Sequence, residues 1–205
     1  QIEKDPNIEV WLNYEVTEEK LDELAALKPY AVVSAVGGRQ VVPNIPGVSL
    51  AVMANDVLSG KCEIRNKKVV VVGGGMTGLE TAEYLAARGN SVQVLEMLPA
   101  PGRGIFNFNV TKTVNALEKQ GTEIHTCTRA DSISKEAVTV TDTRRGRSEE
   151  IPCDVVVLAI GVYTDHSMRD MLEKRFFNVT EIGDANKAGK IMTAVRDGYD
   201  RIKVL

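Results

Sequence analysis

Three glycines and one acid have the types and spacing to bind a ligand that carries phosphates and a ribose. Gly73, Gly75 and Gly78 form a Gly-x-Gly-x-x-Gly pattern directly after the apolar run 69–72, and Glu96 closes the next apolar run. Such a turn lets a pyrophosphate approach the backbone, and the helix that follows offers free N–H groups and a positive dipole end. An acid about 20 residues further on accepts hydrogen bonds from the adenosine ribose. The stretch therefore predicts a dinucleotide site.

The same acid bears on which dinucleotide binds. The Glu96 carboxylate would repel a 2′-phosphate, which favours NAD(H) over NADP(H). Arg103 opposes this interpretation, because an arginine near the ribose can accommodate that phosphate, but it lies in a Pro/Gly loop several residues beyond Glu96. An ordinary glycine turn that binds nothing is the competing interpretation of the motif, and the complete strand–turn–helix–strand context argues against it. We expect NAD(H).

The elements around this motif predict an α/β fold. Residues 69–72 and 154–160 are nearly continuous apolar runs, typical of parallel strands that are buried on both faces. Short strands are predicted over 123–128, over 137–142 and before Cys153, which together indicate an antiparallel meander inserted before the last parallel strand. The expected fold class is a Rossmann-like α/β fold with nested dinucleotide-binding domains, a parallel sheet and an antiparallel β-meander.

Further elements follow from periodicity and capping signals. Residues 8–16 alternate enough to predict a strand, and a short helix is predicted to begin at Thr17, which is followed by two acids. An apolar strand is predicted over residues 30–35. A helix is predicted over residues 107–120, with Gly121 as its C-terminal cap.

Two strand ends and one acid indicate a second ligand site. The strands that end at Gly37 and Gly161 both close on a small residue, an apolar residue and a glycine, and such ends lie where open α/β sheets bind ligands. A short strand then delivers Asp184 to the start of a final helix over residues 191–205. The Asp184 carboxylate can accept hydrogen bonds from a polyol there, and a helix N-cap is its alternative role.

Composition excludes several classes of protein. Of the 205 residues, 43% are hydrophobic and 26% are charged, and the net charge of −3 comes without a basic patch for nucleic acid or an anionic membrane. No apolar run reaches the roughly 18 residues that a membrane span requires. The N-terminus has no initiator Met and no apolar signal region. We therefore expect a soluble cytoplasmic protein, and a fragment of a longer chain.

The cysteines and histidines provide no evident chemistry. Cys62, Cys127 and Cys153 are widely spaced and odd in number, which favours free thiols over a disulfide framework or a redox pair. His125 lies in an alternating run and His166 in a polar turn, without a visible nucleophile or metal partner. We expect both histidines to be structural, and we expect no catalytic side chain and no metal site.

Taken together, these motifs resemble the flavoproteins with two dinucleotide-binding domains, of the pyridine nucleotide–disulphide oxidoreductase type. The order of the motifs is similar: a strand ending Ala35-Val36-Gly37, the linker 42–47, the glycine motif 73–82, the strand 154–161 and Gly183-Asp184-Ala185. Within that superfamily, the chain most resembles the C-terminal part of the NADH:flavin oxidoreductases of the old-yellow-enzyme group, including 2-enoate reductase, 2,4-dienoyl-CoA reductase and trimethylamine dehydrogenase relatives. The stretches that carry this resemblance are 55–61, 73–85 and 183–205.

The resemblance implies domains and site residues. It implies a partial, discontinuous FAD-binding domain over residues 1–58 and 166–205, and an NAD(H)-binding domain over residues 59–165. The residues it implies for NAD(H) are Gly73, Gly75, Met76, Thr77, Gly78, Glu80, Glu96, Met97 and Gly161. The residues it implies for FAD or an adenine nucleotide are Ala35, Val36, Gly37, Gly183 and Asp184.

The chain also departs from the family pattern. Neither a second Gly-x-Gly-x-x-Gly nor a redox Cys-x4-Cys is present. We therefore expect a nucleotide-binding fragment of a flavin-dependent NAD(H) oxidoreductase, inactive by itself, whose partner is an upstream catalytic barrel that can carry FMN and an iron–sulfur cluster. The alternatives are a non-catalytic ADP- or NAD-binding or interface module, and a piece of an NADH oxidase, ferredoxin reductase or disulphide reductase. The substrate and the oligomeric state stay open.

Overall fold

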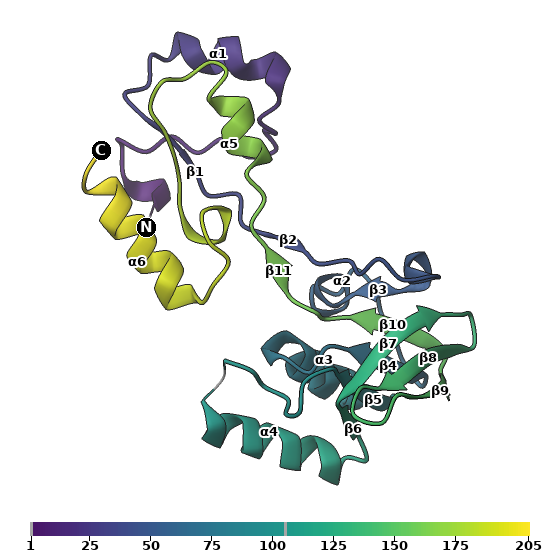
Figure 1. The fold of residues 1–205 in the computed structure, drawn as a ribbon. Helices are drawn as coiled ribbons and strands as arrows, with labels where there is room; N and C mark the ends of the chain where they lie inside the picture. Colours follow the sequence, from purple (N-terminus) through teal and green to yellow (C-terminus); the bar gives the residue numbers. More distant parts are fainter. Residues whose placement is uncertain (1, 105) are drawn as a thin grey trace. The chain divides into compact units, whose positions relative to one another are not determined.

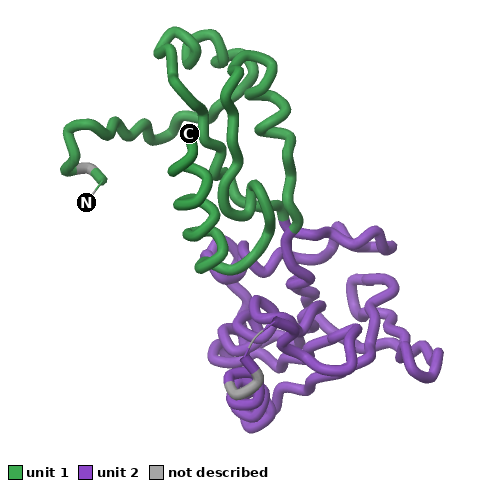
Figure 2. The backbone as a smooth tube through the Cα atoms, turned by 60° about the vertical axis from the view of Figure 1, so that its left-hand side comes forward, with its two compact units in different colours: residues 1–39, 163–205 green, residues 40–162 purple. Residues whose placement is uncertain are grey.

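The computed structural model describes residues 2–104 and 106–205, which form two compact units (Figure 1, Figure 2). Unit 1 extends to Arg39 and resumes over Tyr163–Leu205, whereas unit 2 is Gln40–Val162. Unit 2 is therefore inserted into the chain of unit 1. No helix among the described residues is both long and apolar enough to cross a membrane.

Unit 2 is built on a five-stranded parallel sheet with the strand order β3-β10-β4-β5-β6. Its strands are β3 (Val52–Met53), β4 (Lys68–Val72), β5 (Ser91–Glu96), β6 (Glu123–Thr126) and β10 (Val155–Leu158). The chain runs outward from β4 through β5 to β6 and returns to the other side of β4 with β10 (Figure 1). The sheet therefore changes its winding direction between β4 and β10.

Helices and a second sheet accompany the parallel sheet. The helical segments of unit 2 are η3 (Val48–Leu50), α2 (Ala54–Leu58), α3 (Met76–Ala86) and α4 (Asn107–Lys119). The second sheet is an antiparallel meander of β7 (Thr128–Ile133), β8 (Ala137–Asp142) and β9 (Arg147–Pro152). The predicted α/β fold class, with a parallel sheet and an antiparallel meander, is confirmed, as is the helix that the sequence predicts over residues 107–120.

The valine run of β4 explains why the central sheet is covered on both sides. Val69 and Val71 pack in one apolar cluster with Leu79 of α3, whereas Val70 packs in a second cluster with Val138 of the meander. All five side chains are at most 1% exposed. Successive strand residues point to opposite faces, so a continuous apolar run buries both faces at once. Burying each such side chain contributes about 1.5–3 kcal/mol to the free energy of unfolding.

The strand predicted over residues 123–128 differs in the structure. It is divided into β6, which joins the parallel sheet, and β7, which begins the meander. Cys127 separates the two with a left-handed backbone (φ 53°), and its N–H donates to the Leu98 carbonyl oxygen at 3.0 Å. A single left-handed residue changes the direction of the chain, which periodicity alone does not reveal.

Unit 1 contains a two-stranded parallel sheet, β1 (Val32–Ser34) and β12 (Val179–Glu181), with Ser34 opposite Glu181. Its helical segments are η1 (Ile2–Lys4), η2 (Glu18–Lys20), α1 (Leu21–Ala26), α5 (Ser167–Leu172), η4 (Gly183–Ala185) and α6 (Ile191–Ile202). A further short pair, β2 (Arg39–Gln40) with β11 (Val162–Tyr163), lies at the two points where the chain passes between unit 1 and unit 2. The helix predicted after Thr17 is confirmed by η2 and α1.

The strand predicted over residues 8–16 is wrong. This segment has no strand pairing in the described chain, and four of its large apolar side chains are exposed: Ile8, Val10, Trp11 and Leu12. A strand exists only where a neighbouring strand accepts its hydrogen bonds, and alternation of residue types does not supply that neighbour.

Candidate functional site

The glycine motif lies at the carboxyl end of β4 and leads directly into α3. Gly73 has a φ of 109°, and a Cβ there would lie 2.5 Å from the carbonyl oxygen of Ala159. A Cβ at Gly78 would lie 1.8 Å from the carbonyl oxygen of Gly73. Both distances are far below any van der Waals contact, so the tight turn and the close approach of α3 to β4 require these glycines.

Gly75 differs from Gly73 and Gly78, the other two glycines of the motif, because it faces open space. It is the N-cap of α3, its φ is −71°, and a Cβ there would meet nothing within 4 Å. No side chain caps the helix at this end. The first N–H groups of a helix have no partner within it, and they carry the positive end of the helix dipole. The start of α3 is therefore a cradle into which an anion can enter.

Glu96, at the end of β5, holds this cradle in place. Its Oε2 accepts a hydrogen bond from the N–H of Gly74 at 2.9 Å, and its Oε1 accepts one from the N–H of Leu98 at 2.8 Å. The N–H of Gly102 donates to the Gly74 carbonyl oxygen at 2.7 Å. Glu96 is 9% exposed. The acid is thus the clamp that joins the glycine turn to the loop after β5, while its remaining lone pairs can still accept from a ligand.

A cavity of about 570 Å³ opens between these elements, at the carboxyl edge of the parallel sheet. It takes its walls from the ends of β4, β5 and β10, from the linker before β3 and from the start of the meander. The lining residues are Pro43, Ile45, Val72, Gly73, Gly75, Met76, Thr77, Leu95, Glu96, Met97, Leu98, Arg103, Thr128, Arg129, Ala130, Ala159, Ile160 and Gly161. The volume suits a small-molecule site of about 300–1,000 Å³. The position, at the reversal of winding between β4 and β10, is where open α/β sheets bind ligands.

Only three of the lining residues carry a charge: Glu96, Arg103 and Arg129. The Nε of Arg129 donates to Oδ1 of Asp131 at 2.6 Å, and the Thr141 hydroxyl donates to the other oxygen of the same carboxylate. The hydrogen bond from Thr141, and to a smaller extent that from Arg129, lowers the pKa of Asp131 below its ordinary value despite partial desolvation. The aspartate therefore anchors Arg129 at the cavity wall.

The cavity brings together seven of the nine residues expected for NAD(H). They are Gly73, Gly75, Met76, Thr77, Glu96, Met97 and Gly161. Gly78 is buried beneath the turn, and Glu80 is exposed on α3 outside the cavity lining. Sequence reasoning missed Arg129, Ile45 and the rest of the linker and meander wall. No local motif marks those residues, because they reach the cavity only through the packing of segments distant in the chain.

The residues expected for FAD lie at two places within unit 1. Ala35 and Val36 line a cavity of about 360 Å³, and Val36 and Gly37 line one of about 510 Å³. Gly183 and Asp184 line neither of these cavities. They belong instead to the 3₁₀ turn η4 after β12.

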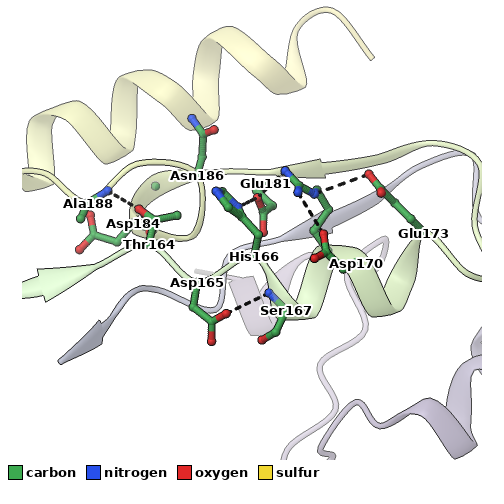
Figure 3. A network of polar contacts seen from close by, with 12 residues as sticks. Thr164, Asp165, His166, Ser167, Asp170, Glu173, Glu181, Asp184, Asn186 and Ala188 are labelled. Atoms are coloured by element: carbon green, nitrogen blue, oxygen red, sulfur yellow. Dashed lines mark hydrogen bonds and ion pairs between the residues drawn. The ribbon is translucent and has the colours of Figure 1, made fainter. Parts of the chain in front are cut away.

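Two hydrogen bonds within unit 1 hold Asp184, which lies beside Thr164 (Figure 3). Its Oδ1 accepts from the N–H of Gly189 at 3.0 Å, and its carbonyl oxygen accepts from the Thr164 hydroxyl at 3.2 Å. The final helix, α6, begins only at Ile191 and has Lys190 as its N-cap. The sequence predicts Asp184 at the start of that helix, whereas the structure inserts the η4 turn and a loop between them.

The two histidines lie outside the cavity beside Glu96. The Nδ1 of His166 lies 2.5 Å from Oε2 of Glu181, whose carboxylate is buried at the end of β12 and also forms an ion pair with Arg169 (Figure 3). The Nε2 of His125 lies 3.0 Å from the side-chain oxygen of Gln93 on the neighbouring strand. Each ring therefore has a polar partner within its own unit.

The parallel sheet, the glycine turn and the cavity at the reversal of winding define a Rossmann-like α/β protein. Residues 3–185 match the family described as pyridine nucleotide–disulphide oxidoreductase. This match covers most of the chain, and the chain belongs to that family.

Several characterised proteins are similar to this chain. An NADH oxidase of Thermoanaerobacter brockii is 33% identical over 184 residues, which cover 87% of this chain and 28% of the relative. A bilirubin reductase of Mediterraneibacter gnavus is 33% identical over 185 residues, which cover 89% of this chain and 28% of the relative. A solved structure of 2-naphthoyl-CoA reductase in complex with 2-naphthoyl-CoA aligns with a TM-score of 0.83 at 30% identity, covering 94% of this chain and 29% of that one. The chain thus spans less than a third of the length of these oxidoreductases.

Proposed function

We propose that this chain is a nucleotide-binding module of a flavin-dependent NAD(H) oxidoreductase and that it binds NADH in the cavity beside the Gly73 turn. One observation carries the proposal. The uncapped start of α3, the open space over Gly75 and the carboxylate of Glu96 all face or border one cavity. A dinucleotide needs these groups together: donors for the pyrophosphate, room for its close approach and an acceptor for the ribose.

The residues present fit this ligand. The N–H groups of the first turn of α3, at Met76 and Thr77, would hold the pyrophosphate, and the free lone pairs of Glu96 would accept from the ribose hydroxyls. Gly161 has a φ of 103°, and a Cβ there would meet nothing within 4 Å, so it would admit the rest of the ligand at the end of β10. Bound NADH supplies a hydride to a flavin. The chain's own part is to bind, to orient and, through its largely apolar wall, to exclude water.

The two units have different roles in this proposal. Unit 2 corresponds to the NAD(H)-binding domain, and unit 1 corresponds to part of a flavin domain, in which Ala35, Val36, Gly37, Gly183 and Asp184 would contact FAD or an adenine nucleotide. The small share of each relative that the chain covers supports a place in a longer protein of the NADH:flavin oxidoreductase group. Electrons would continue there to a centre on another domain, which is where FMN and an iron–sulfur cluster would belong.

Calorimetric titration of the 205-residue chain with NADH tests the proposal. We expect one NADH per chain, and binding at least tenfold weaker in Gly75→Ala, because the added methyl group occupies the space of the pyrophosphate. Gly198→Ala is the matched control: its Cβ lies at an ordinary 3.7 Å from Ile182 in unit 1, so NADH affinity stays unchanged. Absence of NADH binding by the parent chain, or equal affinity in Gly75→Ala, contradicts the proposal.

A further inference from the structure

The last helix of unit 1, α6, is attached to that unit through a network of hydrogen bonds. Asp197 accepts from the N–H of Gly183 at 2.9 Å and from the side-chain amide of Asn186 at 3.1 Å. Arg201 donates to Asp197 at 2.8 Å and to the side-chain oxygen of Asn186 at 3.0 Å. Figure 3 shows Asn186 pointing toward this helix. One face of α6 is therefore held at η4 and the loop after it by polar groups.

A second face of α6 is apolar and uncovered. Four large side chains recur there at spacings of three and four residues, which places them in one stripe along the helix. They are Met192, Val195, Tyr199 and Ile202, with exposed fractions of 83%, 69%, 67% and 45%. None of the twelve residues of α6, all of which the structure describes, is buried. Single exposed apolar residues are ordinary, but a contiguous stripe indicates a surface for docking.

The order of residues in this stripe suits a second copy of the same helix. Positions 192 and 202 are equally distant from position 197, and so are positions 195 and 199. In two antiparallel copies centred at that level, Val195 of one copy lies beside Tyr199 of the other. Met192 of one copy likewise lies beside Ile202 of the other. The stripe is thus self-complementary, as a two-fold interface requires, and its spacing is that of the core positions in paired helices.

The charges of α6 permit this pairing. Arg196 and Asp200, beside the stripe, form an ion pair on their own helix at 4.0 Å. Asp197 and Arg201 likewise pair with each other, at 2.8 Å, on the face toward η4. Antiparallel copies also place the positive end of one helix dipole beside the negative end of the other. The charged groups within α6 are therefore compensated before a second copy arrives.

We propose that the stripe of α6 is a self-association surface, on which a second copy of this chain docks its own α6 in antiparallel orientation. The surface is separate from the NADH cavity, whose lining residues all belong to unit 2. A standard protein interface takes about 20–30 residues from each partner. The stripe is much smaller, so we expect a weak dimer with a Kd on the order of 10–100 μM.

Sedimentation velocity of the 205-residue chain tests the proposal. Between about 5 μM and about 500 μM, concentrations that bracket this Kd, we expect the average mass to rise from monomer to dimer. Val195→Glu and Tyr199→Lys each place a charge against an apolar side chain of the other copy, and each is expected to weaken the dimer at least tenfold. Both positions are exposed in the single chain, so circular dichroism is expected to show unchanged folding.

A matched control and a mixture make the test specific. Thr193→Glu adds a charge at an exposed position of α6 outside the stripe and is expected to leave the dimer unchanged. Mixing Val195→Glu with Tyr199→Lys brings the new carboxylate beside the new ammonium in an antiparallel pair, while the second Val195–Tyr199 contact keeps its parent residues. The mixture is therefore expected to dimerise at least tenfold more tightly than either variant alone. A parallel pair brings neither contact together, so mixing would restore nothing.

Three results overturn the proposal. A parent chain that stays monomeric at about 500 μM assigns the stripe to a partner other than a second copy. Dimers that persist in both Val195→Glu and Tyr199→Lys place the interface elsewhere on the chain. Variants that dissociate singly and do not associate on mixing exclude the antiparallel arrangement.

Discussion

Glu96 offers a test in which folding and ligand binding depend on one side chain. Its carboxylate accepts from two backbone N–H groups, at Gly74 and Leu98, while it is only 9% exposed. A hydrogen bond to a charged group contributes about 1.5–3 kcal/mol. Glu96→Ala removes two of them, and water that enters through the cavity satisfies part of what is lost, so we expect a destabilisation of about 3 kcal/mol. Glu96→Gln keeps one acceptor oxygen, and we expect about 1.5 kcal/mol.

Thermal unfolding followed by circular dichroism measures these losses. A chain of 150–250 residues loses about 2–4 °C in Tm for each kcal/mol, so Glu96→Ala is expected to melt roughly 9 °C lower and Glu96→Gln roughly 4 °C lower. Glu118→Ala makes the same change on the exposed surface of α4 and is expected to stay within about 2 °C. A Tm for Glu96→Ala within about 2 °C of the parent would show that Glu96 does not stabilise the glycine turn, because two buried N–H groups that lose their acceptor must lower the free energy of unfolding.

Three further outcomes follow from the structure. Gly78→Ala places a methyl group 1.8 Å from the Gly73 carbonyl oxygen, so its Tm and its NADH affinity are both expected to fall. Gly75→Ala is expected to lose NADH affinity while its Tm stays unchanged, because a Cβ there meets nothing within 4 Å. Equal Tm values for the two variants contradict this. Asp131, whose pKa the Thr141 hydroxyl lowers below 3.8, stabilises the fold above that pH and loses this contribution as the pH falls through its lowered pKa. Urea titrations from about pH 6 to about pH 3 should therefore show a smaller loss of stability in Asp131→Asn than in the parent, and parallel curves would exclude the effect. Of the three free cysteines only Cys62 is not buried, so a thiol reagent is expected to label one site quickly in the parent and none in Cys62→Ser; rapid labelling of that variant would contradict the burial.

The parts of the fold that sequence predicts well are those that a few adjacent residues determine. Gly73 and Gly78 are required by contacts within one strand–turn–helix unit, so their spacing alone identifies the turn. The valine run of β4 is likewise predicted from its composition to be buried on both faces of the sheet, as it is. The helix over residues 107–120 follows from its apolar period and the glycine after it.

The parts that sequence predicts poorly depend on partners distant in the chain. Residues 8–16 alternate like a strand but have no neighbouring strand in the described chain, and Cys127 redirects the chain with a backbone angle that no periodicity encodes. Arg129 belongs to the cavity only because the meander packs against the parallel sheet. The sequence predicts Glu96 as an acceptor for the ribose. Only the structure shows that its carboxylate also accepts hydrogen bonds from the N–H groups of Gly74, in the glycine turn, and Leu98, in the loop after β5.

Amide NMR of the 205-residue chain during titration with NADH tests whether the dinucleotide binds at the Gly73 turn, because it locates the ligand by residue. We expect saturable shifts concentrated at residues 73–78, at Glu96 and Leu98 and at Gly161, with those residues saturating together at one Kd. Shifts confined to unit 1, or no shifts at the start of α3, would contradict a dinucleotide site built on the Gly73 turn.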